Sequence, residues 1–198
     1  DTLLVHAVQT DSRHAELFAA TAVALAHCPQ SNAKLYNGVA PLSHWLQQGV
    51  KVGLGTDSVV SNNAIDMFAE MRSALMLQRA VFGVDSCMTA PKAVEMATLG
   101  GARALGMAER IGTLEPGKQA DLCVVSLSNT HSFPVYDPYA ALVFSTRGSD
   151  VQMTMVAGKI IYQQGEYPLL REPVPHLRER LRRTVRRIWE TLSHDRSE

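Results

Sequence analysis

Three ionisable side chains, His6, His27 and Asp57, each follow a short run of apolar residues. Such runs are typical of buried β-strands, and α/β proteins place reactive groups at the carboxyl ends of parallel strands. Histidine and aspartate carry protons and bind metal ions, so three of them at one end of a sheet predict a shared catalytic site. Each also has a structural interpretation. A single strand histidine is usually a core or edge residue, and an aspartate before a serine, as in Asp57-Ser58, often caps a helix.

The elements that would hold these side chains alternate between strand and helix. The expected strands are residues 3–8, 22–26 and 50–55. They are almost continuously apolar, as in sheets covered on both faces. Helical spacing of apolar residues predicts helices at residues 12–21 and 39–48, and residues 30–32 are an expected polar loop. The rhythm of strand, helix and strand predicts a parallel sheet with its strands in chain order.

The middle of the chain predicts helices and then a β-rich region. A helix is expected at residues 63–80, with a methionine-rich face that belongs to the core. Thr89 is expected to cap the next helix. Further on, a strand is expected at residues 120–126 and a β-hairpin at residues 151–162, with its turn at residues 157–159.

A basic amphipathic helix is expected at residues 173–193. Its apolar stripe consists of Leu177, Leu181, Val185, Ile188 and Leu192. Arginines occupy the other faces, a pattern that suits RNA or a membrane surface. The favoured alternative is a helix docked on the protein with its arginine face in solvent.

Composition limits the classes of protein to which the chain can belong. It has 198 residues, of which 46% are hydrophobic and 19% charged, as in globular proteins with a substantial core. The formal net charge of zero gives no electrostatic case for binding nucleic acid or an anionic membrane. Three widely spaced cysteines predict a reducing compartment, the cytoplasm. The first residues lack an initiator Met and a signal peptide, so we expect a chain that starts inside a longer fold.

Several motifs together resemble the C-terminal half of the amidohydrolase superfamily, in the branch of metal-dependent deaminases and chlorohydrolases. The similarity is strongest to 5-methylthioadenosine/S-adenosylhomocysteine deaminases and spans about residues 3–165. The motifs are His6, His27-Cys28-Pro29-Gln30-Ser31-Asn32-Ala33-Lys34-Leu35, Gly38-Val39-Ala40-Pro41, Gly55-Thr56-Asp57-Ser58, Ser61-Asn62-Asn63 and the run from Gly112 to Leu122. The family often has a second histidine where this chain has Gln9, and a glycine where it has Ser58.

The resemblance implies an α/β fold that is the C-terminal part of a (β/α)8 barrel. Residues 1–106 would supply the last three barrel strands. Residues 107–165 would form part of a small β-sandwich. Residues 166–198, beyond the resemblance, contain the basic amphipathic helix expected from the apolar stripe. A complete barrel needs about 250 residues, so only part of one is expected here.

The resemblance also implies roles for the candidate site residues. Asp57 would bind a divalent metal and take a proton from metal-bound water, and His6 would polarise the reacting group beside that water. His27, Ser31 and Asn32 would line the substrate pocket. The metal is expected to be zinc, with iron or manganese as alternatives. The other metal ligands and the proton-shuttling glutamate have no counterpart here and would lie upstream of residue 1.

We therefore expect part of a metal-dependent amidohydrolase that deaminates a purine-like or related amino-heterocycle. We expect the 198-residue chain alone to be inactive, and either to form a homo-oligomer or to associate with the missing N-terminal half. The alternative is a non-catalytic half-barrel that serves as an oligomerisation or binding module. A His-x-His strand upstream would favour the enzyme.

Overall fold

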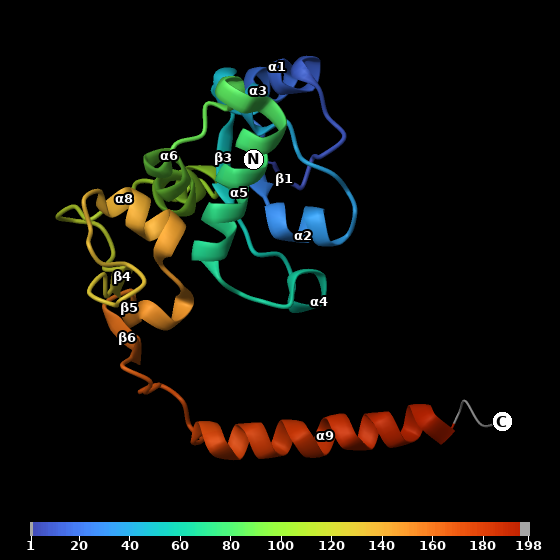
Figure 1. Ribbon diagram of the computed structural model, residues 1–198, viewed down its shortest axis with the longest axis vertical. Coiled ribbons are helices and arrows are strands. Elements are labelled where there is room, and N and C mark those ends of the chain that lie inside the picture. Colours follow the sequence, from blue (N-terminus) through green and yellow to red (C-terminus); the bar gives the residue numbers. More distant parts are fainter. Residues whose placement is uncertain (1, 195–198) are drawn as a thin grey trace.

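A three-stranded parallel sheet forms the first part of the molecule. The computed structural model describes residues 2–194. The sheet consists of β1 (Leu3–Val5), β2 (Ala24–His27) and β3 (Lys51–Leu54), adjacent in that order. Leu4 is opposite Leu25, which is in turn opposite Val52. The predicted parallel order is therefore confirmed (Figure 1).

Strand β1 is shorter and more exposed than the sequence suggested. It ends at Val5, because His6 and Ala7 have positive φ angles of 67° and 46°, which extended chain does not adopt. Leu3, Leu4 and Val5 are 41%, 37% and 49% exposed. The expectation of strands covered on both faces is thus wrong for β1, which is an edge strand within the described residues.

Helices connect the strands and close one apolar core. Helix α1 (Ser12–Ala20) begins at a capping box formed by Asp11 and His14, and α3 (Leu42–Gln47) precedes β3. The core contains side chains from both helices, from β2 and β3, and from the later helices α5 and α6. Its largest fully buried apolar members are Trp45, Leu25, Leu42, Leu75 and Met96. The sheet is thereby fixed against its helical layer.

Residues 30–32 are helical, which corrects the expected polar loop. They lie in α2 (Pro29–Lys34), whose first turn contains the proline. Proline suits that position because its missing N–H has no partner there in any helix and its φ is already helical. The turn after β2 therefore holds Ser31 and Asn32 rigidly.

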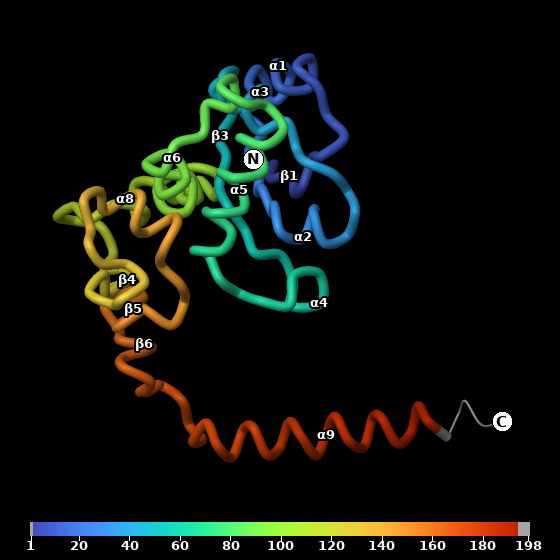
Figure 2. The backbone as a smooth tube through the Cα atoms, viewed as in Figure 1, coloured from blue at the N-terminus to red at the C-terminus, as the bar shows by residue number. Residues whose placement is uncertain are grey.

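A short helix and a long helix follow β3. Helix α4 (Val59–Asn62) ends at Asn63, which adopts a left-handed φ of 68°. Helix α5 (Met67–Phe82) then begins after Asp66, whose carboxylate accepts hydrogen bonds from the N–H groups of Phe68 and Ala69. The predicted helix at residues 63–80 therefore starts four residues too early. Figure 2 shows the connection from β3 through α4 to α5, and α2 and α5 contact each other.

The next helical stretch packs directly on the sheet. Following the 3₁₀ turn Gly83–Ser86, α6 (Ala90–Glu95) continues through a π-helical segment, Met96–Gly100, into α7 (Gly101–Ala104). Thr89 caps α6 as predicted, since its hydroxyl accepts from Lys92 N–H. A Cβ at Gly53 would lie 2.7 Å from the Cα of Gly101. Glycine at position 53 therefore allows helix and strand to touch.

A second, antiparallel sheet follows. It consists of β4 (Leu122–Val125), β5 (Val151–Val156) and β6 (Lys159–Gln163). The β5–β6 hairpin and its turn are confirmed. Between β4 and β5 lie α8 (Pro138–Ala140), the π-helical segment Ala141–Ser145 and the 3₁₀ turn Gly148–Asp150. Arg72 of α5 ties this segment to the first region, donating to the carbonyls of Val143 (3.0 Å) and Thr146 (2.6 Å).

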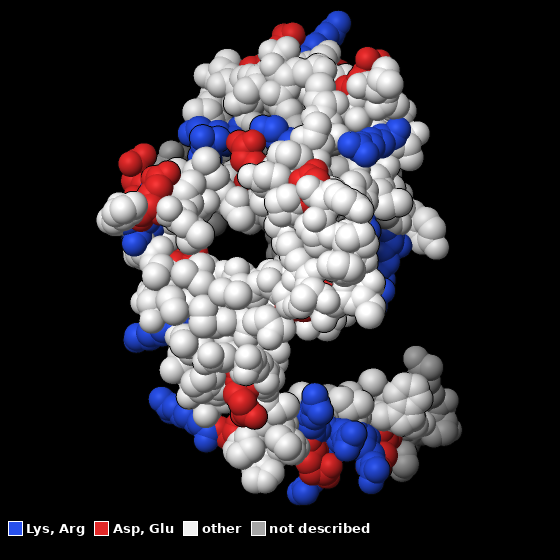
Figure 3. Space-filling model, turned by 60° about the vertical axis from the view of Figure 1, so that its left-hand side comes forward, with Lys and Arg blue, Asp and Glu red and all other residues white. Residues whose placement is uncertain are grey.

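Helix α9 (Val174–His194) extends away from both sheets (Figure 1). Its apolar side chains are exposed: Leu181 63%, Val185 62%, Ile188 52%, Trp189 72% and Leu192 54%. The docked helix favoured from the sequence is therefore not seen within residues 2–194. Arginines gather along this helix (Figure 3). No helix in the described part is long and apolar enough to cross a membrane.

Candidate active site

The ends of the three parallel strands bring the predicted residues together. His6 follows β1, His27 is the last residue of β2, and Asp57 lies three residues beyond β3. Strand pairing continues to this end, because His6 N–H donates to Ala26 O (3.0 Å) and Gly55 N–H to His27 O (2.9 Å). Nε2 of His6 lies 3.8 Å from Oδ2 of Asp57. The sheet thus places the imidazole and the carboxylate at one site.

Both residues have left-handed backbone conformations. The φ angle is 67° at His6 and 57° at Asp57. Non-glycine residues rarely adopt such angles, although His, Asp and Asn do so more often than others, and strained positions cluster at functional sites. Here the left-handed turns end the extended chain directly beside the two reactive side chains.

Two hydroxyl-bearing residues hold the Asp57 carboxylate. The Ser31 hydroxyl donates to Oδ2 (2.7 Å) and the Ser58 N–H donates to Oδ1 (2.8 Å). These two bonds, that of Ser31 first, hold the pKa of Asp57 below its ordinary value, so the group is ionised at neutral pH. Ser58, whose side chain accepts from Ser61 N–H, caps α4. The capping role considered for Asp57 therefore belongs to Ser58.

Asn32 fixes the orientation of His6. Oδ1 of Asn32 lies 2.9 Å from Nδ1 of His6, and an amide oxygen can only accept. Nδ1 therefore carries the proton, and in the neutral ring Nε2 is an acceptor that faces Asp57. Two acceptors facing each other across 3.8 Å form a place for a water molecule or a cation.

His27 is a buried, neutral neighbour of this pair. It is 2% exposed, its ring lies edge-on to Trp45 with centroids 6.0 Å apart, and neither ring nitrogen has a hydrogen-bond partner among the described residues. Burial, with a smaller contribution from the nearby His6, lowers the pKa of His27 to about 4. His27 therefore adds no positive charge to the site at neutral pH.

The sequence interpretation missed Glu70 of α5, a fully buried carboxylate. Oε2 accepts from Gln30 N–H (3.3 Å) and Oε1 from the side-chain amide of Asn62 (2.5 Å). Helical spacing could have revealed it, because Glu70 lies on the same face as Met71 and Ala74, which are buried. An acidic residue on an apolar helix face needs hydrogen-bond donors. The donors here are Gln30, next to Ser31, and Asn62, in the helix that follows Asp57.

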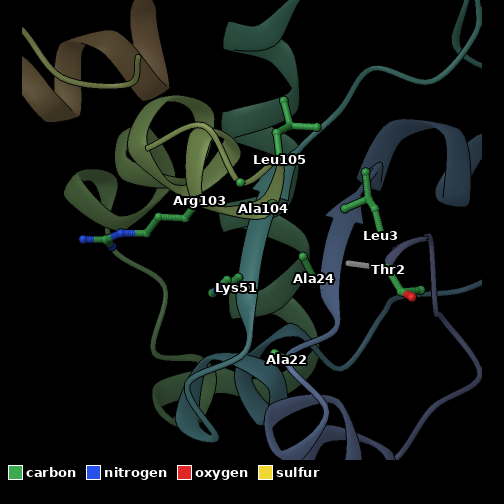
Figure 4. A pocket seen from close by; sticks show the side chains of 9 residues that line it. Thr2, Leu3, Ala22, Ala24, Lys51, Arg103, Ala104 and Leu105 are labelled. Atoms are coloured by element: carbon green, nitrogen blue, oxygen red, sulfur yellow. The ribbon is translucent and has the colours of Figure 1, made fainter. Parts of the chain in front are cut away.

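Two of the cavities near the sheet lie at opposite ends of its strands. One of about 490 Å³ adjoins the site and is lined by residues 6–10 with Tyr36 and Asn37. The other, of about 240 Å³, is lined by Thr2, Ala22 and Lys51, which precede or begin the strands, and by Arg103 of α7 (Figure 4). Only the first cavity includes a candidate catalytic residue, His6.

Residues 2–194 bring no three His, Cys, Asp or Glu residues together as a metal site. What they offer is one ionised carboxylate, Asp57, with the Nε2 lone pair of His6 beside it. An oxygen ligand of this kind suits zinc, which takes three protein ligands in catalytic sites. The donor set therefore fits a metal that is also held by ligands from outside this chain.

Comparisons with known proteins show which family the chain resembles. The model of the amidohydrolase family matches residues 1–161. A 5-methylthioadenosine/S-adenosylhomocysteine deaminase from Moorella thermoacetica is 45% identical over 168 residues, which are 85% of this chain and 39% of the relative. The chain thus spans about two fifths of the length of the curated relatives it matches.

Two solved structures with zinc have the same fold over most of the chain. An adenosine deaminase from Xanthomonas campestris with bound zinc superposes with a TM-score of 0.90 at 36% identity, covering 95% of this chain and 42% of that one. An atrazine chlorohydrolase from Arthrobacter aurescens, complexed with zinc, gives a TM-score of 0.79 at 27% identity, covering 85% and 37%.

Proposed function

The chain belongs to the amidohydrolase family, and on that premise we propose that it is part of a metal-dependent hydrolase that deaminates an amino-heterocycle. The observation that carries the proposal is the pair of His6 and Asp57, 3.8 Å apart at the carboxyl ends of neighbouring parallel strands. A purine-like substrate is favoured, because the relatives include deaminases of 5-methylthioadenosine and of adenosine.

Each site residue has a proposed role in proton movement or binding. A divalent metal, when bound, supplies the positive charge that lowers the pKa of water towards neutrality. Asp57, ionised because Ser31 and Ser58 donate to it, accepts the proton of the attacking water and returns it to the leaving amine. His6, held by Asn32, presents Nε2 to the reacting group. His27, Ser31 and Asn32, the proposed substrate-binding residues, are buried and do not line the 490 Å³ cavity, so they would support the substrate pocket from behind this pair.

Zinc is the proposed metal, with iron and manganese as alternatives. Asp57 is its one proposed ligand in this chain, and the remaining ligands come from outside residues 1–198. Zinc in two structurally similar proteins supports the choice. Metal removal by a chelator should abolish turnover, and re-addition of each metal alone should show which one restores it.

The proposed architecture is the C-terminal part of a (β/α)8 barrel. Strands β1 to β3 would be its last three strands, and β4 to β6 would belong to a small β-sandwich. The exposed strand β1 supports this assignment, because an open edge is a template for a further strand. That strand would come from the N-terminal half of the protein or from another copy of the chain. The boundaries at residues 106 and 165 remain predictions.

The decisive experiment measures ammonia release by the full-length protein. The substrates are 5-methylthioadenosine, adenosine, guanine and a triazine, each tested with the metal-free and zinc-loaded protein. Zinc-dependent release from one of the purines is expected. If the zinc-loaded protein releases no ammonia from any of them, the alternative of a non-catalytic half-barrel module replaces the enzyme.

A further inference from the structure

Glu70 is the central buried charge behind the site. It lies in the first turn of α5 and is fully buried. Burial raises the pKa of Glu70 in spite of the hydrogen bonds from Gln30 and Asn62. A group in such surroundings is retained only where its partners compensate for the loss of water. Its contacts therefore indicate what it does.

The first contact of Glu70 controls the placement of Ser31. Gln30 N–H donates to Oε2 of Glu70 (3.3 Å), and Gln30 also donates from its side chain to the Ser73 hydroxyl (3.1 Å). Both contacts join the first turn of α2 to α5. Ser31 is the next residue, and its hydroxyl donates to Asp57 (2.7 Å).

The second contact controls the backbone that leads into Asp57. The side-chain amide of Asn62 donates to Oε1 of Glu70 (2.5 Å) and to the carbonyl of Thr56 (2.7 Å). Thr56 immediately precedes Asp57. The segment that carries Ser31, at the start of α2, and the segment that carries Asp57, after β3, are therefore both hydrogen-bonded to the carboxylate of Glu70 or to its partner Asn62.

We propose that Glu70 is a positioning residue that holds Ser31 and Asp57 in register, a role that rests on the proposed function of Asp57 in deamination. Both partners of Glu70 are donors, so two acceptor oxygens are required. Glutamine has the same shape but would present its NH₂ group to one of these donors. Glu70 itself moves no proton to substrate, because it is fully buried and both oxygens are engaged.

Backbone hydrogen–deuterium exchange on the metal-free full-length protein, read by mass spectrometry, tests this role without substrate or metal. In Glu70→Gln, exchange should accelerate about tenfold in peptides covering residues 28–34 and 55–63, as expected from losing a hydrogen bond to a charged group. Peptides covering the core of β2 and β3 should keep their wild-type rates, because the sheet does not depend on Glu70.

Two further variants separate positioning from general destabilisation. Asn62→Ala removes one connection only and should accelerate exchange at residues 55–63 but not at 28–34. Asp150→Asn alters another buried, hydrogen-bonded carboxylate, in the second region, and should leave both site peptides unchanged.

Unchanged exchange in both site peptides of Glu70→Gln, or acceleration spread evenly over the chain, would overturn the proposal. If Glu70→Gln does not give a folded chain, Asn62→Ala decides, since unchanged exchange at residues 55–63 in that variant has the same consequence. In the full-length enzyme, Glu70→Gln should lower kcat about tenfold with KM unchanged. Failure of that protein to deaminate at all would count against the proposed function and leave the exchange result intact.

Discussion

Two of the carboxylate–histidine pairs within residues 2–194 are built in opposite ways. Asp150, 3% exposed, lies directly against His131 (Nε2 to Oδ2, 2.9 Å) and also accepts from Asn129 (2.8 Å) and from the backbone of Arg147 (2.9 Å). Asp57 and His6 face each other across 3.8 Å without a direct hydrogen bond. Asp150 and His131 are hydrogen-bonded to each other, whereas Asp57 and His6 are each fixed by a hydrogen bond with another residue, Ser31 and Asn32 respectively.

This difference shows how a fold separates stability from reactivity. The hydrogen bonds around Asp150 engage both of its oxygens and leave little capacity for a further ligand. Each oxygen of Asp57 accepts a single hydrogen bond, from Ser31 or from Ser58, and Nε2 of His6 faces this carboxylate without a direct hydrogen bond. Pre-organised groups with open faces are what binding a metal or water requires. The predictions below test this contrast, from the largest expected effect to the smallest.

The open pair should need ligands that this chain does not contain. We expect the purified 198-residue chain to hold far less than one zinc per chain and to release no ammonia from an aminopurine, because Asp57 is its one matched ligand and a catalytic zinc takes three. Metal analysis and a deaminase assay measure both. A monomer with one zinc per chain that turns over an aminopurine would show that the ligands are misassigned, with His27 as the first candidate for the missing one.

Removing the charge of Asp57 should reduce turnover strongly, whereas removing the charge of Asp150 should leave turnover almost unchanged. In the full-length protein, Asp57→Asn should lower kcat by about 10³-fold or more, since an amide can neither accept the proton nor bind the metal well. Asparagine tolerates the left-handed backbone at this position, so the fold should survive. Asp150→Asn is the matched control and should keep kcat within about twofold. Steady-state kinetics with metal analysis decides, and equal turnover in Asp57→Asn and wild type would reject the assignment.

The two histidines provide the next test. His6→Asn, which also tolerates the local backbone, should lower kcat about 10²-fold while zinc content stays near that of wild type, because the proposed role of His6 is to act on the reacting group and not to bind the metal. His131→Asn should leave turnover unchanged. Loss of zinc in His6→Asn would instead make His6 a metal ligand.

Much of the fold followed from short-range patterns. The order of β1 to β3, the cap at Thr89 and the β5–β6 hairpin are confirmed, because each depends on residues close in the sequence. Helix α2 was missed since its six residues have no apolar periodicity. Its contacts come from elsewhere in the chain, namely Glu70 through Gln30 and Asp57 through Ser31.

The site was predictable as a set of residues but not as a geometry. Strand ends predicted that His6 and Asp57 would meet, and the 3.8 Å distance confirms it. The hydrogen bond of Asn32 to His6 joins residues 26 positions apart, and that of Glu70 to Gln30 joins residues 40 apart. Such long-range polar contacts depend on tertiary packing, which local pattern does not encode.

Asp150 should contribute more than Asp57 to the stability of the fold, which reverses the order expected for their effects on turnover. Asp150→Ala should lower the free energy of unfolding by about 2 kcal/mol, because it removes the buried acceptor of three hydrogen bonds, donated by His131, Asn129 and Arg147. Asp57→Asn should cost less, since water can reach that partly exposed site. Urea denaturation of the 198-residue variants measures both, with Asp85→Ala in the exposed turn before α6 as control. A larger loss of unfolding free energy in Asp57→Asn than in Asp150→Ala would contradict the interpretation that Asp57 contributes less to stability than Asp150.

The smallest expected effect is a dependence of stability on acidity. Burial alone would raise the pKa of Asp150, but hydrogen bonds from His131 and from the backbone of Arg147 outweigh it and hold the pKa below the ordinary value of 3.8. A carboxyl group whose pKa is lower in the folded than in the unfolded chain stabilises the fold when the pH is above the unfolded-state pKa. This contribution is lost as the pH falls through the folded-state pKa.

The stability difference between wild type and Asp150→Asn should therefore shrink as the pH falls below 4. Titrating groups that do not contact Asp150 are shared, so their contributions largely cancel in that difference. Urea midpoints at pH 7, 5, 4 and 3 provide the measurement. A difference that grows as the pH falls would mean that Asp150 is protonated more easily in the fold than in the unfolded chain. In that case the effect of burial on the pKa of Asp150 would outweigh the effect of its hydrogen bonds.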